Sequence, residues 1–257
     1  EAELDYEDRE DPSIFVHFDA TDSNVVAEAF GVALNETASF LIWTTTPWTL
    51  VANMAITVWP RFEYSLVKLG SHVTVIATEL LSTVAETVGM TPEVLGTTKG
   101  DVLVGLRYNH VFCDRTCPII SGDHVTLEDG TGLVHTAPGH GTDDYIVGLA
   151  NNLDIYCPVL ADGTYDETVP EFLAGLSVWD ANDVVVEHLK SSDYLCHVSM
   201  YTHSYPHDGR SKTPVIFRST EQWFVGVDTE FTDGKSMRAM ALQATENDIT
   251  FHPAWAQ

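Results

Sequence analysis

Three consecutive threonines followed by proline form the first stretch whose residue types could do chemistry. This stretch, TTTPWT, ends a β-branched and aromatic run and holds Thr44, Thr45, Thr46, Trp48 and Thr49, with Asn53 shortly after it. Successive side chains of a strand point to opposite faces, so the hydroxyl groups would lie on both faces of the chain. Such a cluster could hold a water molecule or a ribose. The alternative, that threonine is there only because it suits strands, is the one that spacing alone favours.

A glycine-rich bend at 130–145, GTGLVHTAPGHGTDDY, is the second such stretch. It places His135, His140, Asp143 and Asp144 close together where a strand leads into the start of a helix. One interpretation is a metal site made by the two histidines and an aspartate. Another is a carboxylate that binds an amine beside a size-selective pocket. In the third, the aspartates only cap a helix and the histidines are structural. Residue types alone do not choose among these three.

Short strands are the main elements that must position the two stretches. We expect strands at 13–18, 39–46, 55–58, 64–69 and 73–77, a hairpin joining 125–128 to 132–135, and further strands at 214–218 and 222–227. Helices are expected at 79–88, 142–151 and 180–190, with caps at Thr78, Thr142 and Asp180. Residues 1–12 form an acidic leading segment.

The strands do not alternate strictly with helices, which argues against a doubly wound nucleotide-binding fold. We therefore expect an α+β fold, with a curved, β-barrel-like sheet as the core and helices at the periphery. With no linker or repeat in the pattern, one domain is expected over residues 1–257.

Composition and charge exclude several classes of protein. The chain has 257 residues, 44% of them hydrophobic, and 38 Asp and Glu against 12 Lys and Arg, for a net charge of −26. No apolar run approaches the ~20 residues of a membrane helix, and the first residues do not resemble a signal peptide. We expect a cytoplasmic monomer without membrane contact. The acidic balance also argues against a broad electrostatic grip on nucleic acid, so any RNA contact must be local or supplied by another part of a larger protein.

Cysteine spacing gives no strong metal signal. Cys113 and Cys117 are separated by three residues, which is off the usual zinc-knuckle spacing, and Cys157 and Cys196 lie far away. We expect structural thiols in a reducing compartment.

The two stretches together closely resemble the editing domain inserted into the catalytic domain of isoleucyl-tRNA synthetases. The family patterns TTTPWTLPAN and GTGxVHxAPGHGxxDY are present here as TTTPWTLVAN (44–53) and GTGLVHTAPGHGTDDY (130–145). The valyl and leucyl enzymes carry TTRP in the first pattern, so Thr46 before proline points to the isoleucyl branch. Further matches at 162–165, 181–183, 212–218 and 222–224 extend the resemblance over essentially the whole chain.

Two departures from the family pattern stand out. Val51 replaces the usual proline, and residues 205–211 (YPHDGRS) contain no cysteine where many relatives carry a cysteine-rich zinc knuckle. We therefore predict no metal and no other cofactor. Neither a HIGH-like nor a KMSKS-like segment is present, so we expect a domain excised from a larger synthetase that does not make aminoacyl-adenylate.

The resemblance implies hydrolytic proofreading. The domain would hydrolyse valyl-tRNA(Ile), with valyl-adenylate as a further candidate substrate, and spare the larger isoleucyl ester. An alternative is a degenerate domain that binds the aminoacylated tRNA end without hydrolysing it. The implied partners are the 3′ end of tRNA(Ile) carrying valine and the rest of the synthetase chain.

The resemblance also implies a role for each site residue. Asp144 would pair with the α-ammonium group of the substrate, and Thr44, Thr45 and Thr46 would position the attacking water. His135 would limit the size of the side chain. The rest of the substrate site would be formed by Trp48, Thr49, Asn53, Gly139 and His140.

Overall fold

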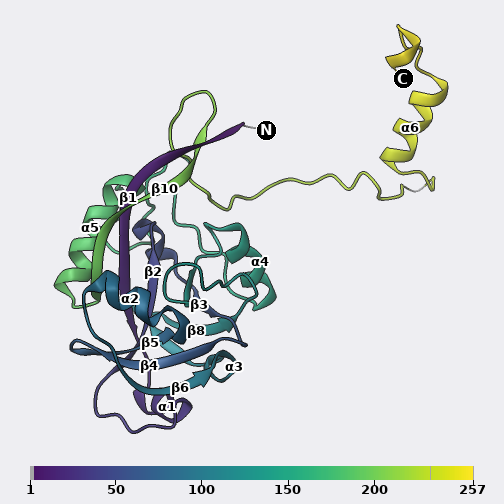
Figure 1. The fold of residues 1–257 in the computed structure, drawn as a ribbon. Coiled ribbons are helices and arrows are strands. Elements are labelled where there is room, and N and C mark those ends of the chain that lie inside the picture. The colour runs from purple at the N-terminus through teal and green to yellow at the C-terminus, as the bar shows by residue number, and fades with distance from the viewer. Residues whose placement is uncertain (1–2, 232, 257) are drawn as a thin grey trace. The chain divides into compact units, whose positions relative to one another are not determined.

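The computed structural model describes residues 3–231 and 233–256, and its internal contacts divide the chain into two units, Glu1–Ser219 and Thr220–Gln257 (Figure 1). The second unit contains helix α6 (Met237–Asn247) and the 3-10 helix η3 (Ala254–Ala256). No residue of α6 is buried, so this unit has no core comparable to that of the first. The hydrophobic core lies in the first unit, and one domain over residues 1–257 stays a prediction. Within the described residues, no helix is long and apolar enough to cross a membrane.

A six-stranded sheet forms the larger layer of the first unit. Its order is β10-β1-β2-β5-β4-β6, in which β2 and β5 are parallel and the other neighbours are antiparallel. Its strands are β1 (Leu4–Asp19), β2 (Ala38–Thr44), β4 (Glu63–Leu69), β5 (His72–Ala77), β6 (Glu93–Lys99) and β10 (Leu195–Asp208). Six of the seven residues of β2 are buried, as expected for a central strand covered on both faces.

A second, four-stranded sheet brings the two sequence motifs together. Its order is β7-β8-β3-β9, with β7 (Arg107–Asn109), β8 (Thr116–Ser121), β3 (Ala55–Val58) and β9 (Val134–Thr136). After β2, the chain turns through the 3-10 helix η1 (Pro47–Ala52) into the fully buried strand β3. Because β9 pairs with β3, with Ile56 opposite His135, the glycine-rich bend lies beside the threonine stretch.

Helices cover the sheets at several points. They are α1 (Ser23–Ala29), α2 (Leu81–Val88) after the 3-10 helix η2 (Thr78–Leu80), α3 (Gly100–Leu103), α4 (Thr142–Ala150) and α5 (Val178–Ser191). The longest, α5, buries Val178, Ala181, Val185 and Leu189, whose spacing of three and four residues forms one apolar face. This face packs into the same core as β2.

The predicted strands at 55–58, 64–69 and 73–77 are confirmed to within one residue, and the α+β class is confirmed. Neither sheet closes into a barrel within the described residues, so the barrel-like core is a loose description of two open sheets. The predicted hairpin at 125–135 is wrong, because only residues from 134 onward enter a sheet and Gly130 and Gly132 adopt φ values of +76° and +75°.

Both ends of the first unit also differ from the prediction. Residues 4–12 do not form a separate leading segment but are the first half of β1, which pairs with β10 from Leu4 opposite Asp208. The strands predicted at 214–218 and 222–227 are absent from the described structure, where Pro214 makes only an isolated bridge with His207. Proline has no N–H group to extend that bridge into a ladder.

The predicted helix caps are wrong as well. Helix α5 starts after Ser177, whose hydroxyl accepts a hydrogen bond from the Asp180 N–H at 3.2 Å. Helix α4 follows Gly141, and no side chain caps it. Thr142 and Asp180 are therefore the first and third residues of their helices, and Thr78 begins η2 ahead of α2.

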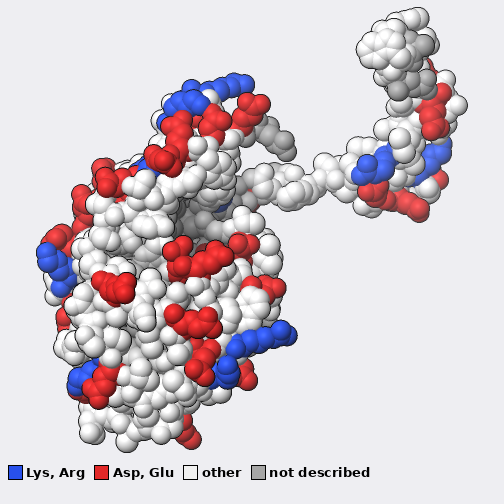
Figure 2. All heavy atoms as spheres, in the orientation of Figure 1, with Lys and Arg blue, Asp and Glu red and all other residues white. Residues whose placement is uncertain are grey.

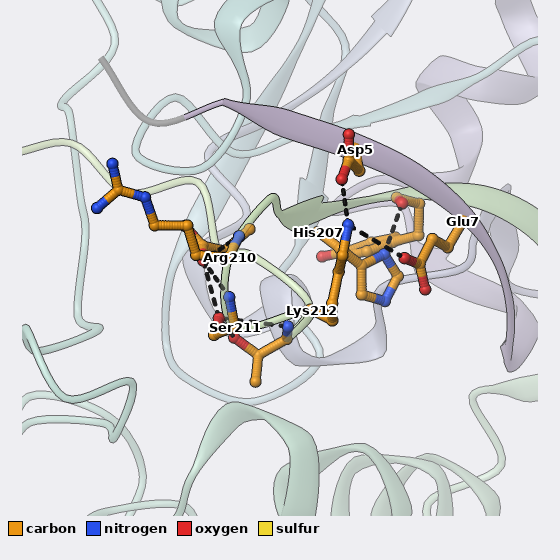
Figure 3. A network of polar contacts seen from close by, with 9 residues as sticks. Asp5, Glu7, His207, Arg210, Ser211 and Lys212 are labelled. Atoms are coloured by element: carbon orange, nitrogen blue, oxygen red, sulfur yellow. Dashed lines mark hydrogen bonds and ion pairs between the residues drawn. The ribbon is translucent and has the colours of Figure 1, made fainter.

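A turn at 209–211 follows β10 at the end of the β1–β10 pair and leads back beside β10 at Pro214 (Figure 3). Asp208 Oδ1 accepts hydrogen bonds from two backbone N–H groups of this turn, at 2.7 and 3.1 Å. Lys212 forms an ion pair with Asp5 and lies 4.0 Å from a carboxylate oxygen of Glu7. Hydrogen bonds and ion pairs thus hold this cysteine-free stretch in place.

Gly132 lies where the glycine-rich bend packs closely against the larger sheet. A Cβ atom at Gly132 would lie 2.3 Å from Ala77 Cβ, whereas one at Gly175, where φ is +76°, would meet no atom within 4 Å. Gly175→Ala is expected to lower the free energy of unfolding by about 1–2 kcal/mol, the cost of left-handed backbone. Gly132→Ala should lower it by about 1–3 kcal/mol more, because overpacking is added. Urea unfolding of both variants measures the difference, and equal losses would contradict the close packing.

Candidate active site

One cavity of ≈360 Å³ brings the threonine stretch and the glycine-rich bend together in the first unit. Seven of the ten predicted site residues line it, namely Thr44, Thr45, Thr46, Thr49, His135, His140 and Asp144. Trp48, Asn53 and Gly139 do not line it. The end of β2, the helix η1, strand β9 and the start of α4 supply the walls.

The threonine hydroxyls form a connected chain. Thr49 Oγ1 donates to the carbonyl oxygen of Thr46 at 2.8 Å and lies 3.2 Å from Thr46 Oγ1, which in turn lies 3.1 Å from Thr44 Oγ1. Thr44 Oγ1 also accepts the Thr46 N–H at 3.1 Å. Among the described residues, the Thr45 hydroxyl has no hydrogen-bond partner, so it is free to bind a ligand at the cavity wall.

His135 is a neutral imidazole with a defined tautomer. Asn53 Nδ2 donates to the carbonyl oxygen of Ala55 at 3.0 Å and to His135 Nδ1 at 2.8 Å, while Asn53 Oδ1 accepts the Tyr108 hydroxyl. His135 Nδ1 is therefore an acceptor, and the ring proton lies on Nε2, which donates to Thr49 Oγ1 at 3.0 Å. Burial, with smaller contributions from two neighbouring histidines, lowers the pKa of His135 to about 3.

Asp144 lies in the first turn of α4 with one oxygen anchored. Its Oδ2 accepts the Ala137 N–H at 2.9 Å, and no partner for Oδ1 lies within the described residues. Burial raises the pKa of this carboxyl, while the Ala137 N–H and the nearby His124 partly offset that effect. The site thus presents one free carboxylate oxygen to the cavity. Asp143 is exposed and lines a different cavity, which makes it a control for its neighbour.

Trp48 and His140 support one wall of the cavity. The His140 Nδ1–H donates to the carbonyl oxygen of Phe217 at 2.9 Å, and its ring meets the Trp48 indole edge-on with 5.1 Å between centroids. The Trp48 backbone N–H donates to Asn182 Oδ1 of α5 at 3.1 Å. Trp48 thus packs behind this wall, and its contact with substrate stays a prediction.

Gly139 is a packing residue that the sequence placed in the substrate site. A Cβ atom there would lie 2.3 Å from the carbonyl oxygen of Tyr156, so no larger residue fits. It lines a second cavity that adjoins the first.

Several lining residues were missed by the sequence analysis: Trp43, His124, Thr126, Asp129 and Thr131. His124 has a buried Nε2 atom without a hydrogen-bond partner in the described structure. The Asn182 side chain that holds the η1 turn was also missed, although the 181–183 match to the family gave a signal for it.

The four cysteines are free thiols. Cys117 is buried as expected of a structural thiol, Cys157 and Cys196 are half-buried, and Cys113 is exposed. Within residues 3–231 and 233–256, no group of three or more His, Cys, Asp or Glu side chains is placed to hold a metal ion. The absence of zinc stays a prediction.

Buried neutral histidines predict an acid-sensitive fold. Burial lowers the pKa of His17, His110 and His135 to about 3, from an unfolded value near 6.5. Between these two pKa values the unfolded chain binds more protons than the folded chain does. The stabilisation from the neutral histidines is therefore complete above about pH 6.5, and the free energy of unfolding falls as the pH decreases below that value. Each histidine contributes a slope of about 1.4 kcal/mol per pH unit.

Urea unfolding at a series of pH values below about 6.5 measures this slope. His17→Gln should reduce the slope by about 1.4 kcal/mol per pH unit, the contribution of one such histidine. The raised pKa of Asp144 acts in the opposite direction, because protonation of that carboxyl on acidification favours the folded state. A free energy of unfolding independent of pH in this range would contradict the prediction.

Known proteins resemble this chain in fold and in sequence. No family model matches the chain. In solved structures, GlLeuRS-CP1 superposes with a TM-score of 0.58 at 14% identity, covering 73% of this chain and 99% of that one. The editing domain of the P. knowlesi cytosolic leucyl-tRNA synthetase gives 0.58 at 13% identity, covering 75% and 96%. The fold is that of the editing domains of class I aminoacyl-tRNA synthetases.

The sequence gives a narrower match. The isoleucine–tRNA ligase of Haemophilus ducreyi is 43% identical over 258 residues, which cover 100% of this chain and 27% of that protein. The whole chain is thus similar to one segment of an isoleucine–tRNA ligase, and it has the fold of a synthetase editing domain. It therefore spans about a quarter of the length of this relative.

Proposed function

We propose that this domain hydrolyses the ester of valyl-tRNA(Ile) and spares isoleucyl-tRNA(Ile), as the proofreading site of an isoleucyl-tRNA synthetase. The observation that carries the proposal is the single cavity lined by Asp144, by the threonines at 44–46 and by neutral His135. Valyl-adenylate, which carries the same amino acid, is a further candidate substrate. The domain would act as a monomer within a cytoplasmic synthetase whose remaining chain delivers the tRNA end.

Each wall of the cavity suits one part of an aminoacyl ester. The free Oδ1 of Asp144 would accept the α-ammonium group through a charge-assisted hydrogen bond. The unpaired Thr45 hydroxyl, with the neighbouring hydroxyls of Thr44 and Thr46, would hold the attacking water or the terminal ribose. These contacts would orient the water against the ester carbonyl, so that catalysis rests on positioning.

The nucleophile in this proposal is water. Among the described residues, the cavity lining contains no serine, cysteine or lysine that could form a covalent intermediate. His135 would set the size limit, because both its ring nitrogens are held and its ring cannot easily swing away. An extra methylene is worth only about 1–3 kcal/mol of binding in an apolar pocket, so a second, hydrolytic selection is useful to such an enzyme.

Deacylation assays test the proposal. Valyl-tRNA(Ile) and isoleucyl-tRNA(Ile) are incubated with this chain and, in parallel, with the full-length synthetase. Rapid loss of the valyl ester with a stable isoleucyl ester is the expected result. Binding of both esters without hydrolysis, by the full-length enzyme as well, would instead support the degenerate domain that only binds the tRNA end.

A further inference from the structure

A second cavity of ≈200 Å³ adjoins the first and shares His140 with it. One side is formed by the start of α4 and the preceding bend, through Thr142, Tyr145 and residues 138–141. The other side is formed by residues 217–219, the last segment of the first unit. The two cavities therefore lie next to each other and have His140 in common.

The segment 217–219 is fixed against the glycine-rich bend. The Ser219 N–H donates to the carbonyl oxygen of Gly139 at 2.7 Å, and the His140 Nδ1–H donates to the carbonyl oxygen of Phe217 at 2.9 Å. These two bonds hold the backbone on both sides of Arg218. The position of Arg218 at the second cavity is thus set by the same bend that carries the site residues of the first.

Arg218 is half-buried, and only part of its guanidinium is occupied. Its Nε–H donates to the carbonyl oxygen of Val159 at 3.0 Å, and it forms no ion pair within the described residues. Ion pairs with carboxylates do form at five other basic side chains, Arg9, Lys68, Lys190, Lys212 and Arg238. The two Nη atoms of Arg218 remain as donors that no protein acceptor of the described residues uses.

The charge of the surroundings makes this arginine unusual. The chain has a net charge of −26, and acidic side chains are more widespread than basic ones on the face of the first unit seen in Figure 2. Among the described residues, Arg218 is the only lysine or arginine that lines either of the two adjoining cavities. Arg218 therefore supplies a cationic side chain at which an anion entering the cavities can be bound.

His140, at the junction of the two cavities, is the second observation that points to a ligand. It is 8% exposed, and its Nδ1–H is used by Phe217, so Nε2 carries a lone pair. This Nε2 atom is buried and has no hydrogen-bond partner in the described structure. An acceptor of this kind suits a sugar hydroxyl, which is a neutral donor.

We propose that Arg218 binds the phosphodiester group that precedes the terminal nucleoside of the RNA, so that the strand reaches the first cavity through the second. Guanidinium groups bind phosphate through two parallel hydrogen bonds, and the two free Nη atoms can supply them. The aminoacylated nucleoside then occupies the first cavity, with His140 accepting a ribose hydroxyl between the two. This inference rests on the proposed function, since it assigns the route of the same substrate.

Two esters that differ by one phosphate provide the test. Hydrolysis of 2′(3′)-O-valyladenosine is compared with that of its 5′-phosphate, and valyl-tRNA(Ile) is the natural substrate. Arg218→Gln is expected to raise KM for the phosphorylated ester and for the tRNA about tenfold, and to leave KM for the phosphate-free ester unchanged. Arg61→Gln removes the same charge from an exposed position and should change neither KM.

Arg218→Lys and thermal melting separate phosphate binding from a structural role. Lysine keeps the charge but not the paired donors, so its KM should lie between those of the wild type and the glutamine variant. A structural role through Val159 would instead lower kcat for all three substrates together with the melting temperature.

Equal KM values of the wild type for the two small esters would overturn the phosphate site even if both esters are hydrolysed. If neither ester is hydrolysed, the proposed function fails, and the comparison is repeated on their dissociation constants. Equal constants for the two esters would then overturn the phosphate site independently.

Discussion

Replacement of Asp144 with asparagine is expected to lower kcat/KM for valyl-tRNA(Ile) hydrolysis by about 10- to 100-fold in a protein that stays folded. Asparagine preserves the shape of the side chain and an acceptor for the Ala137 N–H, which lies 2.9 Å from Oδ2. It lacks the negative charge that the free oxygen would offer to the α-ammonium group. The loss therefore isolates the charge-assisted contact from the local geometry.

The direction of the stability change in Asp144→Asn can also be predicted. Because burial raises the pKa of Asp144, the folded state favours the neutral carboxyl. Above that pKa the ionised group lowers the free energy of unfolding, and asparagine removes this cost. The melting temperature at neutral pH should be unchanged or higher. A lower melting temperature with a parallel loss of activity would mean that Asp144 mainly holds the start of α4.

Asp143→Asn is the matched control. It removes the same charge from the adjacent residue, which is exposed and lines another cavity. Its kcat/KM should equal that of the wild type, and a loss equal to that of Asp144→Asn would point to a general electrostatic effect. The pH profile adds a second readout, because wild-type hydrolysis should fall as pH drops through the raised pKa of Asp144.

The buried central strands could be predicted from sequence, whereas the long polar edge strand β10 could not. Strands β3, β4 and β5 are short apolar runs bounded by turn residues, so local pattern was sufficient. Strand β10 alternates polar and aromatic side chains in its second half, and all ten of its residues before Tyr205 are exposed or only half-buried without a clean apolar face. It is a strand because it pairs with β1, about 200 residues away in the chain, as Leu4 opposite Asp208 illustrates. A pairing of such long range leaves no local signal.

The site shows the same division. Both motifs were found, and they line one cavity, because each motif sits where a strand ends. The two sequence motifs did not indicate which of their residues face the cavity. The Trp48 side chain is buried and its backbone N–H is held by Asn182, and Gly139 packs against the Tyr156 backbone, so both depend on neighbours that are far away in sequence. The tautomer of His135 could not be predicted from sequence either, because it depends on a hydrogen bond with Asn53, whose orientation is set in turn by Tyr108.

His135→Ala is expected to change specificity more than activity. The ring lines the cavity and is held at both nitrogens, by Asn53 at 2.8 Å and by Thr49 at 3.0 Å, so it behaves as a rigid wall. A side chain that overlaps such a wall costs about 1–3 kcal/mol. Trimming the ring should therefore lower the ratio of kcat/KM for the valyl ester to that for the isoleucyl ester by about 10- to 100-fold.

The same change should destabilise the protein. It leaves Asn53 and Thr49 without their buried partner, and each unsatisfied group costs about 1–3 kcal/mol. The ratio of the two kcat/KM values is the decisive measurement, because the fraction of unfolded enzyme affects both substrates equally. Hydrolysis of the isoleucyl ester should rise in absolute rate once it is corrected for the folded fraction.

His110→Ala supplies the control for this prediction. His110 is also buried, and its Nε2–H donates to the carbonyl oxygen of Leu50 at 3.1 Å, but its ring does not line the cavity. Its removal should lower the free energy of unfolding and leave the specificity ratio unchanged. If His135→Ala behaves in the same way and is slower on both esters, then His135 is a scaffold residue for Thr49. The size limit would in that case lie at Thr46, whose hydroxyl shares the same hydrogen-bond chain.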